Sequence, residues 1–70
     1  MIPDEILKWA VADYKTYGER SNVFFRLNNV ERIAMDNYFL HEMKHPLCWE
    51  PGTREYRFTT IVKEIANELL

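Results

Sequence analysis

The segment from about Asn29 to Lys44 constrains the fold more than any other part of the chain. It is predicted to be helical, and its apolar side chains occupy more than half of the helix circumference: Val30, Ile33, Ala34, Met35, Tyr38, Phe39, Leu40 and Met43. A helix with so wide an apolar surface must be covered on more than one side. A chain of 70 residues has few other residues with which to cover it. The sequence therefore favours a homodimer or insertion into a groove of a partner protein.

Two further helices are predicted at the ends of the chain. Residues of about 3–17 have apolar side chains at helical spacing, a proline and two acidic residues in the first turn, and Gly18 as the C-terminal cap. Residues of about 59–70 are also amphipathic at helical spacing, and Thr59 or Thr60 is expected to cap their amino end.

The segment between the first two helices is ambiguous. Alternation predicts a strand near 22–27, with one set of side chains facing inward and the other outward: Val23, Phe25 and Leu27 against Asn22, Phe24 and Arg26. The same residues are also compatible with a helix. We prefer the strand because Asn28 and Asn29 interrupt the helical pattern, and because Asn28 with Glu31 is typical of a capping box.

Two prolines punctuate the region after the long helix. Pro46 is expected to end that helix, because the residue before a proline is disfavoured in helical conformation. Pro51-Gly52 is a strong turn signal between two short apolar runs, which indicates a loop or a hairpin around 47–58.

Together these patterns predict one domain over residues 1–70 with a helix-dominated α+β fold. Its elements are three helices (about 3–17, 29–44 and 59–70), a short strand near 22–27 and a hairpin around 47–58. An all-α fold is the alternative, and it applies if residues 21–27 are helical.

Composition excludes several classes of protein. No apolar run approaches the length of a membrane span, and the first residues lack the basic start and apolar core of a signal peptide. Cys48 is the single cysteine, so no intrachain disulfide is available and a cytoplasmic location is expected. The net charge of −2 gives no general signal for nucleic acid, although a local basic patch remains compatible with it.

One short string has the pattern of a metal site. Residues His41-Glu42-Met43-Lys44-His45 match HExxH, and so resemble the active-site helix of zinc metallopeptidases. The resemblance implies that the two histidines bind zinc and that Glu42 is the general base. Pro46 displaces His45 from the helix, however, so zinc is the remote alternative and we expect no enzyme, cofactor, small-molecule substrate or metal site.

The favoured function is that of a small binding protein that regulates or inhibits a larger protein assembly, in the style of chains encoded by phages or mobile elements. Large aromatic residues dominate binding energy in protein interfaces. The expected partners are another protein and a second copy of the chain. The candidate partner-binding residues are the aromatic side chains that exceed what one small core can hide: Trp9, Tyr17, Phe24, Trp49 and Tyr56.

The alternative function is a dimeric DNA-binding transcriptional regulator. The predicted order of strand, helix and helix loosely resembles ribbon-helix-helix repressors, in which paired strands enter the major groove. That resemblance implies that Asn22, Phe24 and Arg26 face DNA, with Asn22 and Arg26 reading bases. A winged-helix variant would place its wing near Pro51-Gly52. The candidate nucleic-acid residues of the two variants together are Arg20, Asn22, Arg26, Arg54 and Arg57.

Overall fold

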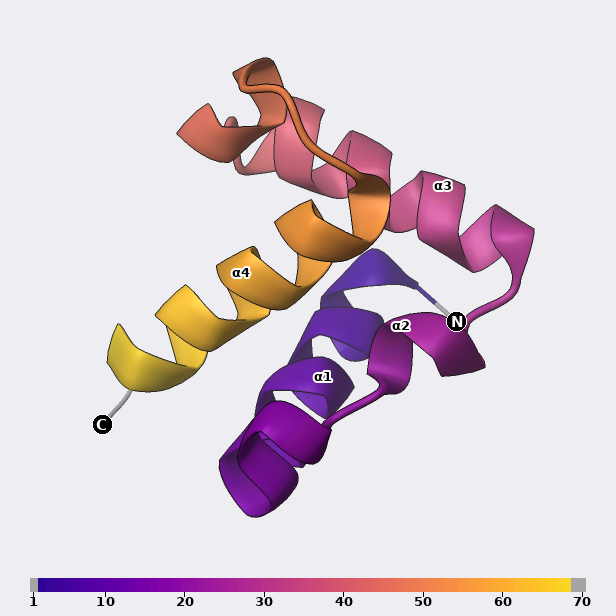
Figure 1. The fold of residues 1–70 in the computed structure, drawn as a ribbon. Helices are drawn as coiled ribbons and strands as arrows, with labels where there is room; N and C mark the ends of the chain where they lie inside the picture. The colour runs from indigo at the N-terminus through magenta and orange to yellow at the C-terminus, as the bar shows by residue number, and fades with distance from the viewer. Residues whose placement is uncertain (1, 69–70) are drawn as a thin grey trace.

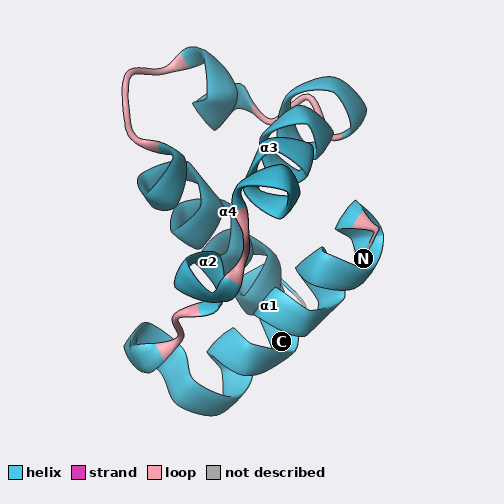
Figure 2. Cartoon of the chain, turned by 90° about the vertical axis from the view of Figure 1, so that its right-hand side faces the viewer, coloured by secondary structure: helices cyan, strands magenta, loops and turns pink. Residues whose placement is uncertain are grey.

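The chain folds as an all-helical structure in a computed structural model that describes residues 2–68 (Figures 1 and 2). The α-helices are α1 (Pro3–Tyr17), α2 (Val23–Arg26), α3 (Asn29–Asn37) and α4 (Arg54–Glu68). The shorter elements are two 3-10 helices, η1 (Gly18–Arg20) and η3 (Pro46–Trp49), and one π-helix, η2 (Tyr38–Glu42). Residues 2–68 contain no strand, so the predicted α+β class is wrong and the all-α alternative is the one that fits.

The helices α1 and α4 pack side by side, and α3 lies across the ends at which both of them begin (Figure 1). The ion pair between Arg54 Nε and Asp36 Oδ2, at 2.8 Å, joins the start of α4 to α3. The core between these helices consists of Ile6, Ala10, Val11, Val23, Phe24, Leu27, Met35, Phe39, Phe58, Ile61, Val62 and Ala66. Within residues 2–68, none of the helices combines the length and the apolar character needed to cross a membrane.

The predicted first helix is confirmed at both of its ends. Proline stands in its first turn, where no backbone N–H is needed, and Ile6 and Ala10 are buried one turn apart. Gly18 caps the helix with a positive φ of 60°, and its N–H donates to the carbonyl of Tyr14. A side chain with a Cβ atom adopts this backbone conformation only at a cost in strain.

The predicted strand near 22–27 is wrong, because residues 23–26 form α2. Alternation would bury Val23, Phe25 and Leu27 on one face. Instead the adjacent residues Val23 and Phe24 are buried together with Leu27, whereas Phe25 is exposed. Positions i, i+1 and i+4 share a face of a helix but not of a strand. One turn of helix therefore brings both Val23 and Phe24 onto the core.

The helix α3 begins as predicted and ends early. Its capping box is present: Asn28 Oδ1 accepts from the backbone N–H of Glu31 at 2.8 Å, and Glu31 Oε1 accepts from that of Asn28 at 3.0 Å. The predicted helix of 29–44 is α-helical only to Asn37 and continues as the π-helix η2. The helical segment ends before Pro46, as expected, and His45 is extended with ψ 129°; the chain already leaves the helix at Lys44, which has a positive φ of 50°.

The predicted hairpin around 47–58 is also wrong. Residues 46–49 form η3, and α4 begins at Arg54, five residues before the predicted start at 59. Thr53 takes the place of the predicted caps, because its Oγ1 accepts from the N–H of Tyr56 at 3.1 Å. Phe58 is buried at helical spacing with Ile61, so the second apolar run belongs to the helix and not to a strand. The predicted end at 69–70 lies outside the described residues.

A row of phenylalanine rings ties the elements together. The ring of Phe58 on α4 lies with its centroid 5.6 Å from that of Phe24 on α2 and 5.9 Å from that of Phe39 in η2. Phe25 extends the row toward solvent, with its centroid 5.7 Å from that of Phe24. Centroid spacings of this size are those at which aromatic pairs attract beyond their burial.

Replacement of Phe58 tests this packing. Phe58→Ala is expected to lower the free energy of unfolding by about 3–5 kcal/mol, because it removes a large buried ring and leaves a cavity. Phe25→Ala is the matched control, because its ring is 62% exposed; its effect is expected to be about 0.5 kcal/mol. Urea unfolding followed by circular dichroism measures both values. Equal losses in the two variants would contradict the proposed role of Phe58.

Candidate partner-binding site

The structure divides the five predicted aromatic anchors into two groups. Trp49, Tyr56 and Tyr17 are exposed, with 64%, 54% and 59% of their surface accessible. Trp9 is half-buried at the edge of the core, and Phe24 is a core residue. The buried position of Phe24 follows from the helical geometry of α2, and it removes Phe24 from the set of accessible anchors.

Trp49 stands at the end of a short, well-braced helix. The ring of His45 caps η3, since its Nδ1 accepts from the N–H of Leu47 at 3.1 Å. Leu47 and Cys48 pack against the core, which leaves Trp49 on the outer side. The indole ring is thus held outward by the inward packing of its two neighbours.

Tyr56 lies on the other side of the same loop. Its ring covers Gly52, where an added Cβ atom would lie 3.3 Å from Tyr56 Cδ2. Arg57 Nη1 donates to the carbonyl oxygen of Gly52 at 3.0 Å and fixes the loop from the helix side. Trp49 and Tyr56 therefore flank one loop, residues 50–53, which is held at both ends. We name the surface formed by Trp49, residues 50–53 and Tyr56 the aromatic loop.

Two polar contacts anchor the aromatic loop to the rest of the fold. His45 Nε2 lies 2.8 Å from Glu64 Oε2 on α4, and Arg54 pairs with Asp36 on α3. Because Nδ1 of His45 accepts a hydrogen bond, the neutral ring carries its proton on Nε2 and donates it to Glu64. Both contacts lie outside residues 50–53, and neither of them involves Trp49 or Tyr56.

A second exposed apolar surface runs along α3. Val30 is 76% and Ile33 47% exposed, on the side of the helix opposite the buried Met35. Ala34, Asn37 and His41 continue this side at helical spacing and line one shallow hollow with Pro3 and Tyr38. We name the row of Val30, Ile33, Ala34, Asn37 and His41 the α3 outer face.

Val30 and Ile33 are not among the residues predicted to be exposed, although the sequence contains the signal. At 100° per residue they lie opposite Met35 and Phe39, which are the most deeply buried apolar residues of the segment. The sequence does not show which side of this helix faces the core, and the structure does.

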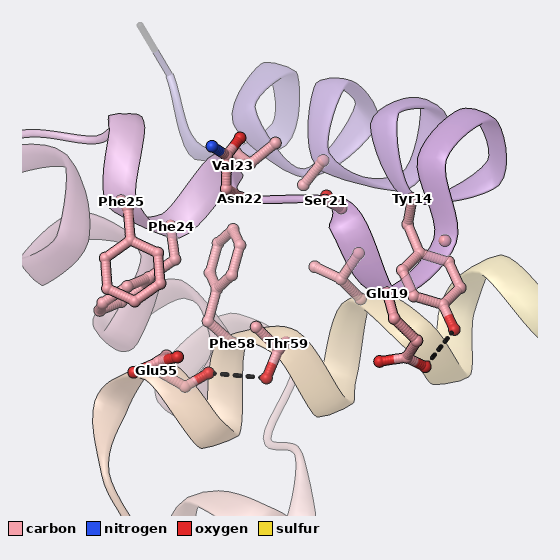
Figure 3. A pocket seen from close by; sticks show the side chains of 13 residues that line it. Tyr14, Glu19, Ser21, Asn22, Val23, Phe24, Phe25, Glu55, Phe58 and Thr59 are labelled. Carbon is pink, nitrogen blue, oxygen red and sulfur yellow. Dashed lines mark hydrogen bonds between the residues drawn. The ribbon is translucent and has the colours of Figure 1, made fainter.

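One cavity lies between α1, α2 and α4 (Figure 3). Its volume is about 310 Å³, with the rings of Phe24 and Phe58 on one side and Glu19 on the other. Its hydroxyl groups already have intramolecular partners: Ser21 Oγ donates to Asp13 Oδ2 at 2.7 Å, and Thr59 Oγ1 donates to backbone carbonyls. No histidine, cysteine or lysine lines this cavity, and the titratable groups among its lining residues are Tyr14, Glu19 and Glu55.

The HExxH pattern does not form a convergent pair of histidines. Pro46 places His45 outside the helix, and both ring nitrogens of His45 already have protein partners. His41 is exposed on the α3 outer face. Among residues 2–68, no group of three or more histidine, cysteine or acidic residues has the arrangement of a metal site.

Cys48 has the environment of a structural thiol. Burial raises the pKa of its thiol above the ordinary value, with Arg57 acting in the opposite direction. The nucleophilic thiolate is therefore scarce at neutral pH. This agrees with the packing of Cys48 against the core.

The five candidate nucleic-acid residues fall into two sets. Arg54 and Arg57 are held by Asp36 and by the carbonyl of Gly52. Arg20, Asn22 and Arg26, which lie in one stretch between α1 and α3, are exposed. Neither Arg20 nor Arg26 forms an ion pair within residues 2–68.

No family model, no curated protein and no solved structure matches this chain. Its function is accordingly inferred from the geometry of its own residues.

One surface charge pair offers a test of the local electrostatics. The ammonium of Lys63 donates to Glu19 Oε1 at 3.1 Å, and the hydroxyl of Tyr14 donates to the same oxygen at 3.2 Å. These contacts, with Lys63 the larger cause, hold the pKa of Glu19 below its ordinary value. The pair therefore stabilises the fold at pH values above the ordinary pKa of a glutamate, and this contribution is lost as the pH falls through the lowered pKa of Glu19.

Lys63→Met is expected to return the pKa of Glu19 toward its ordinary value, as measured by carbon-detected NMR titration of the side-chain carboxyl. Lys44→Met, which removes an exposed lysine outside α1, η1 and α4, serves as the control and should leave this pKa in place. An unchanged pKa of Glu19 in Lys63→Met would show that the ion pair is not populated in solution.

Proposed function

We propose that the chain is a non-enzymatic binding protein that docks on another protein through the aromatic loop, and that it regulates or inhibits the assembly to which that protein belongs. The observation that carries the proposal is the 64% exposure of Trp49. Tryptophan is a residue that proteins bury for most of its surface, and it is the residue most enriched among binding hot spots.

The exposure of Trp49 has no function in folding. The core is complete without it, because Leu47 and Cys48 already cover this side of α4 and the core. An exposed ring of this size instead costs solvation free energy in the free chain. Burial in a partner would recover that free energy.

The aromatic loop is also well prepared for binding. Its ends are held by the cap of His45 and by the contact of Arg57 with Gly52, so little backbone freedom is lost when a partner docks. The two nearest arginines, Arg54 and Arg57, already have partners in the chain. A contact carried by apolar rings should therefore weaken little as salt is added.

Replacement of Trp49 tests the proposal. Trp49→Ala is expected to weaken partner binding by about 2 kcal/mol, or roughly thirtyfold, because a hot-spot ring is lost. The tagged chain is used to capture partners from lysate at low and high salt, and the captured protein is then purified and titrated by calorimetry. Circular dichroism should show that Trp49→Ala retains its fold.

The matched control is Phe25→Ala, which removes a ring of similar exposure on a different part of the surface. It should leave the affinity unchanged. An equal loss of affinity in both variants, or none in a folded Trp49→Ala, would remove the aromatic loop as the binding surface.

DNA binding is the second candidate, favoured by one specific arrangement. α2 and α3 are joined by the two residues Leu27 and Asn28, which gives a short helix, a tight turn and a second helix. In helix-turn-helix proteins the second helix enters the major groove. Arg20, Asn22 and Arg26 would supply contacts to phosphates and bases in this reading. It ranks second because α2 has only four residues and the net charge is −2.

The salt dependence of binding separates the two candidates. A DNA complex should lose affinity steeply as salt rises, through release of counterions, and Arg26→Gln should reduce the slope by about one unit. Fluorescence anisotropy with a mixed-sequence duplex measures both effects. Absence of binding at low salt would eliminate the DNA candidate.

A further inference from the structure

We propose that the cavity between α1, α2 and α4 is a binding site for an organic cation of the alkylguanidinium class. Within residues 2–68, the residues that line this cavity include neither Trp49 nor Tyr56 nor any of the loop residues 50–53. The inference therefore goes beyond the proposed function, and each can fail without the other.

The aromatic wall of the cavity is the first reason. The rings of Phe24 and Phe58 lie on one side, and Phe25 also lines the cavity from α2 (Figure 3). The faces of aromatic rings attract cations. The volume of about 310 Å³ is about ten times the volume of a water molecule in the liquid, which is enough for a guanidinium with a short alkyl chain.

The charge of the lining is the second reason. Glu19 and Glu55 line the cavity, and within residues 2–68 no lysine, arginine or histidine does. Glu55 lies beside the phenylalanine rings and Glu19 lies toward the other end (Figure 3). The carboxylate of Glu55 forms no ion pair in the described part of the chain. Lys63 and Tyr14 both contact Oε1 of Glu19, which leaves Oε2 of Glu19 able to accept.

The hydrogen-bond donors of the cavity are the third reason. The hydroxyls of Ser21 and Thr59 donate to Asp13 and to backbone carbonyls, and the hydroxyl of Tyr14 donates to Glu19. The side chain of Asn22 also lines the cavity, and its amide accepts as readily as it donates. The capacity that remains is therefore mostly that of acceptors. A ligand that fits must supply the donors, together with a positive charge.

A contact elsewhere in the chain favours a guanidinium over an ammonium. The guanidinium of Arg32 lies 4.6 Å from the centroid of the Phe24 ring, and its Nε donates to the carbonyl of Phe24 at 3.0 Å. Arg32 does not line the cavity, so this contact leaves the cavity open. A guanidinium is planar, carries several donors and is more weakly hydrated than an ammonium, so it loses less when it leaves water for an aromatic wall.

Titration of the full-length chain with n-butylguanidinium, followed by amide NMR, tests the proposal. The amides of the lining residues should shift, with a dissociation constant of about 1 mM, because the ligand is small and the carboxylates are partly hydrated. n-Butylurea is the matched control ligand, because it has nearly the same shape and no charge. It should bind at least about tenfold more weakly.

Two substitutions test the carboxylates. Glu55→Gln should weaken the binding of n-butylguanidinium by about fivefold, because it removes a charge and keeps the shape of the side chain. Glu5→Gln, the same change at an exposed position that does not line the cavity, is the control and should bind as the wild type does.

Lys63→Met should have the opposite effect. It removes the cation that contacts Glu19, so n-butylguanidinium should bind about twofold to threefold more tightly. Lys44→Met is the control and should leave the affinity unchanged. A variant that only disturbs the fold would not bind the cation more tightly.

A second ligand distinguishes the source of the cation. The probe is an acetylated and amidated glycine-arginine-glycine peptide, which presents the same guanidinium as a protein side chain. Tighter binding of the peptide than of n-butylguanidinium assigns the cavity to an arginine of another protein. Weaker binding of the peptide assigns the cavity to a free small molecule.

Three results would overturn the proposal. The first is absence of binding by both cationic probes at about ten times the expected dissociation constant. The second is equal binding of n-butylguanidinium and n-butylurea. The third is an affinity in a folded Glu55→Gln that equals that of Glu5→Gln. None of these outcomes affects the titration of Trp49→Ala, which reports on the aromatic loop.

Discussion

The contact of Phe58 with Phe24 and Phe39 is the interaction on which the rest of the structure depends. It joins three elements that are distant in sequence, and the helices α1 and α4 pack around it to complete the core. Because Phe24 reaches this contact only when residues 23–26 are helical, the ring packing also determines the conformation of α2. The direction in which α3 leaves the core, and hence the side of α3 that faces solvent, follows from the position of Phe39.

A closed core in so short a chain changes how its apolar residues are to be understood. The wide apolar surface of the segment 29–44 suggests that the chain cannot bury its own side chains, but it buries Met35 and Phe39 almost completely. Of the seven large apolar side chains that are exposed among residues 2–68, four lie on two surfaces, the aromatic loop and the α3 outer face. The first presents rings on a braced loop, as in binding hot spots. The second presents the aliphatic side chains of Val30 and Ile33.

Local signals in the sequence predicted the local structure well and the tertiary structure poorly. The first helix, the capping box of Asn28 and the end of the helical segment before Pro46 depend on neighbouring residues, and all three are confirmed. The predictions of a strand near 22–27 and of a hairpin around 47–58 were wrong. Residues 22–27 fit both the two-residue period of a strand and the 3.6-residue period of a helix, and only the contact of Phe24 with Phe58 decides between them. The π-helix and the exposed side of α3 also depend on packing. Among the predicted anchors, Trp49 and Tyr56 are exposed as partner binding requires, whereas Phe24 is buried.

The central claim is that the chain closes its core while holding Trp49 out in water. Fluorescence quenching of the Trp9→Phe variant by acrylamide tests it most directly, because Trp49 is then the single indole. The account predicts emission typical of a hydrated indole, and quenching nearly as efficient as for free tryptophan amide in a dilute, folded sample. A blue-shifted emission that resists acrylamide at the same dilution would mean that Trp49 packs within its own chain, which would contradict the account.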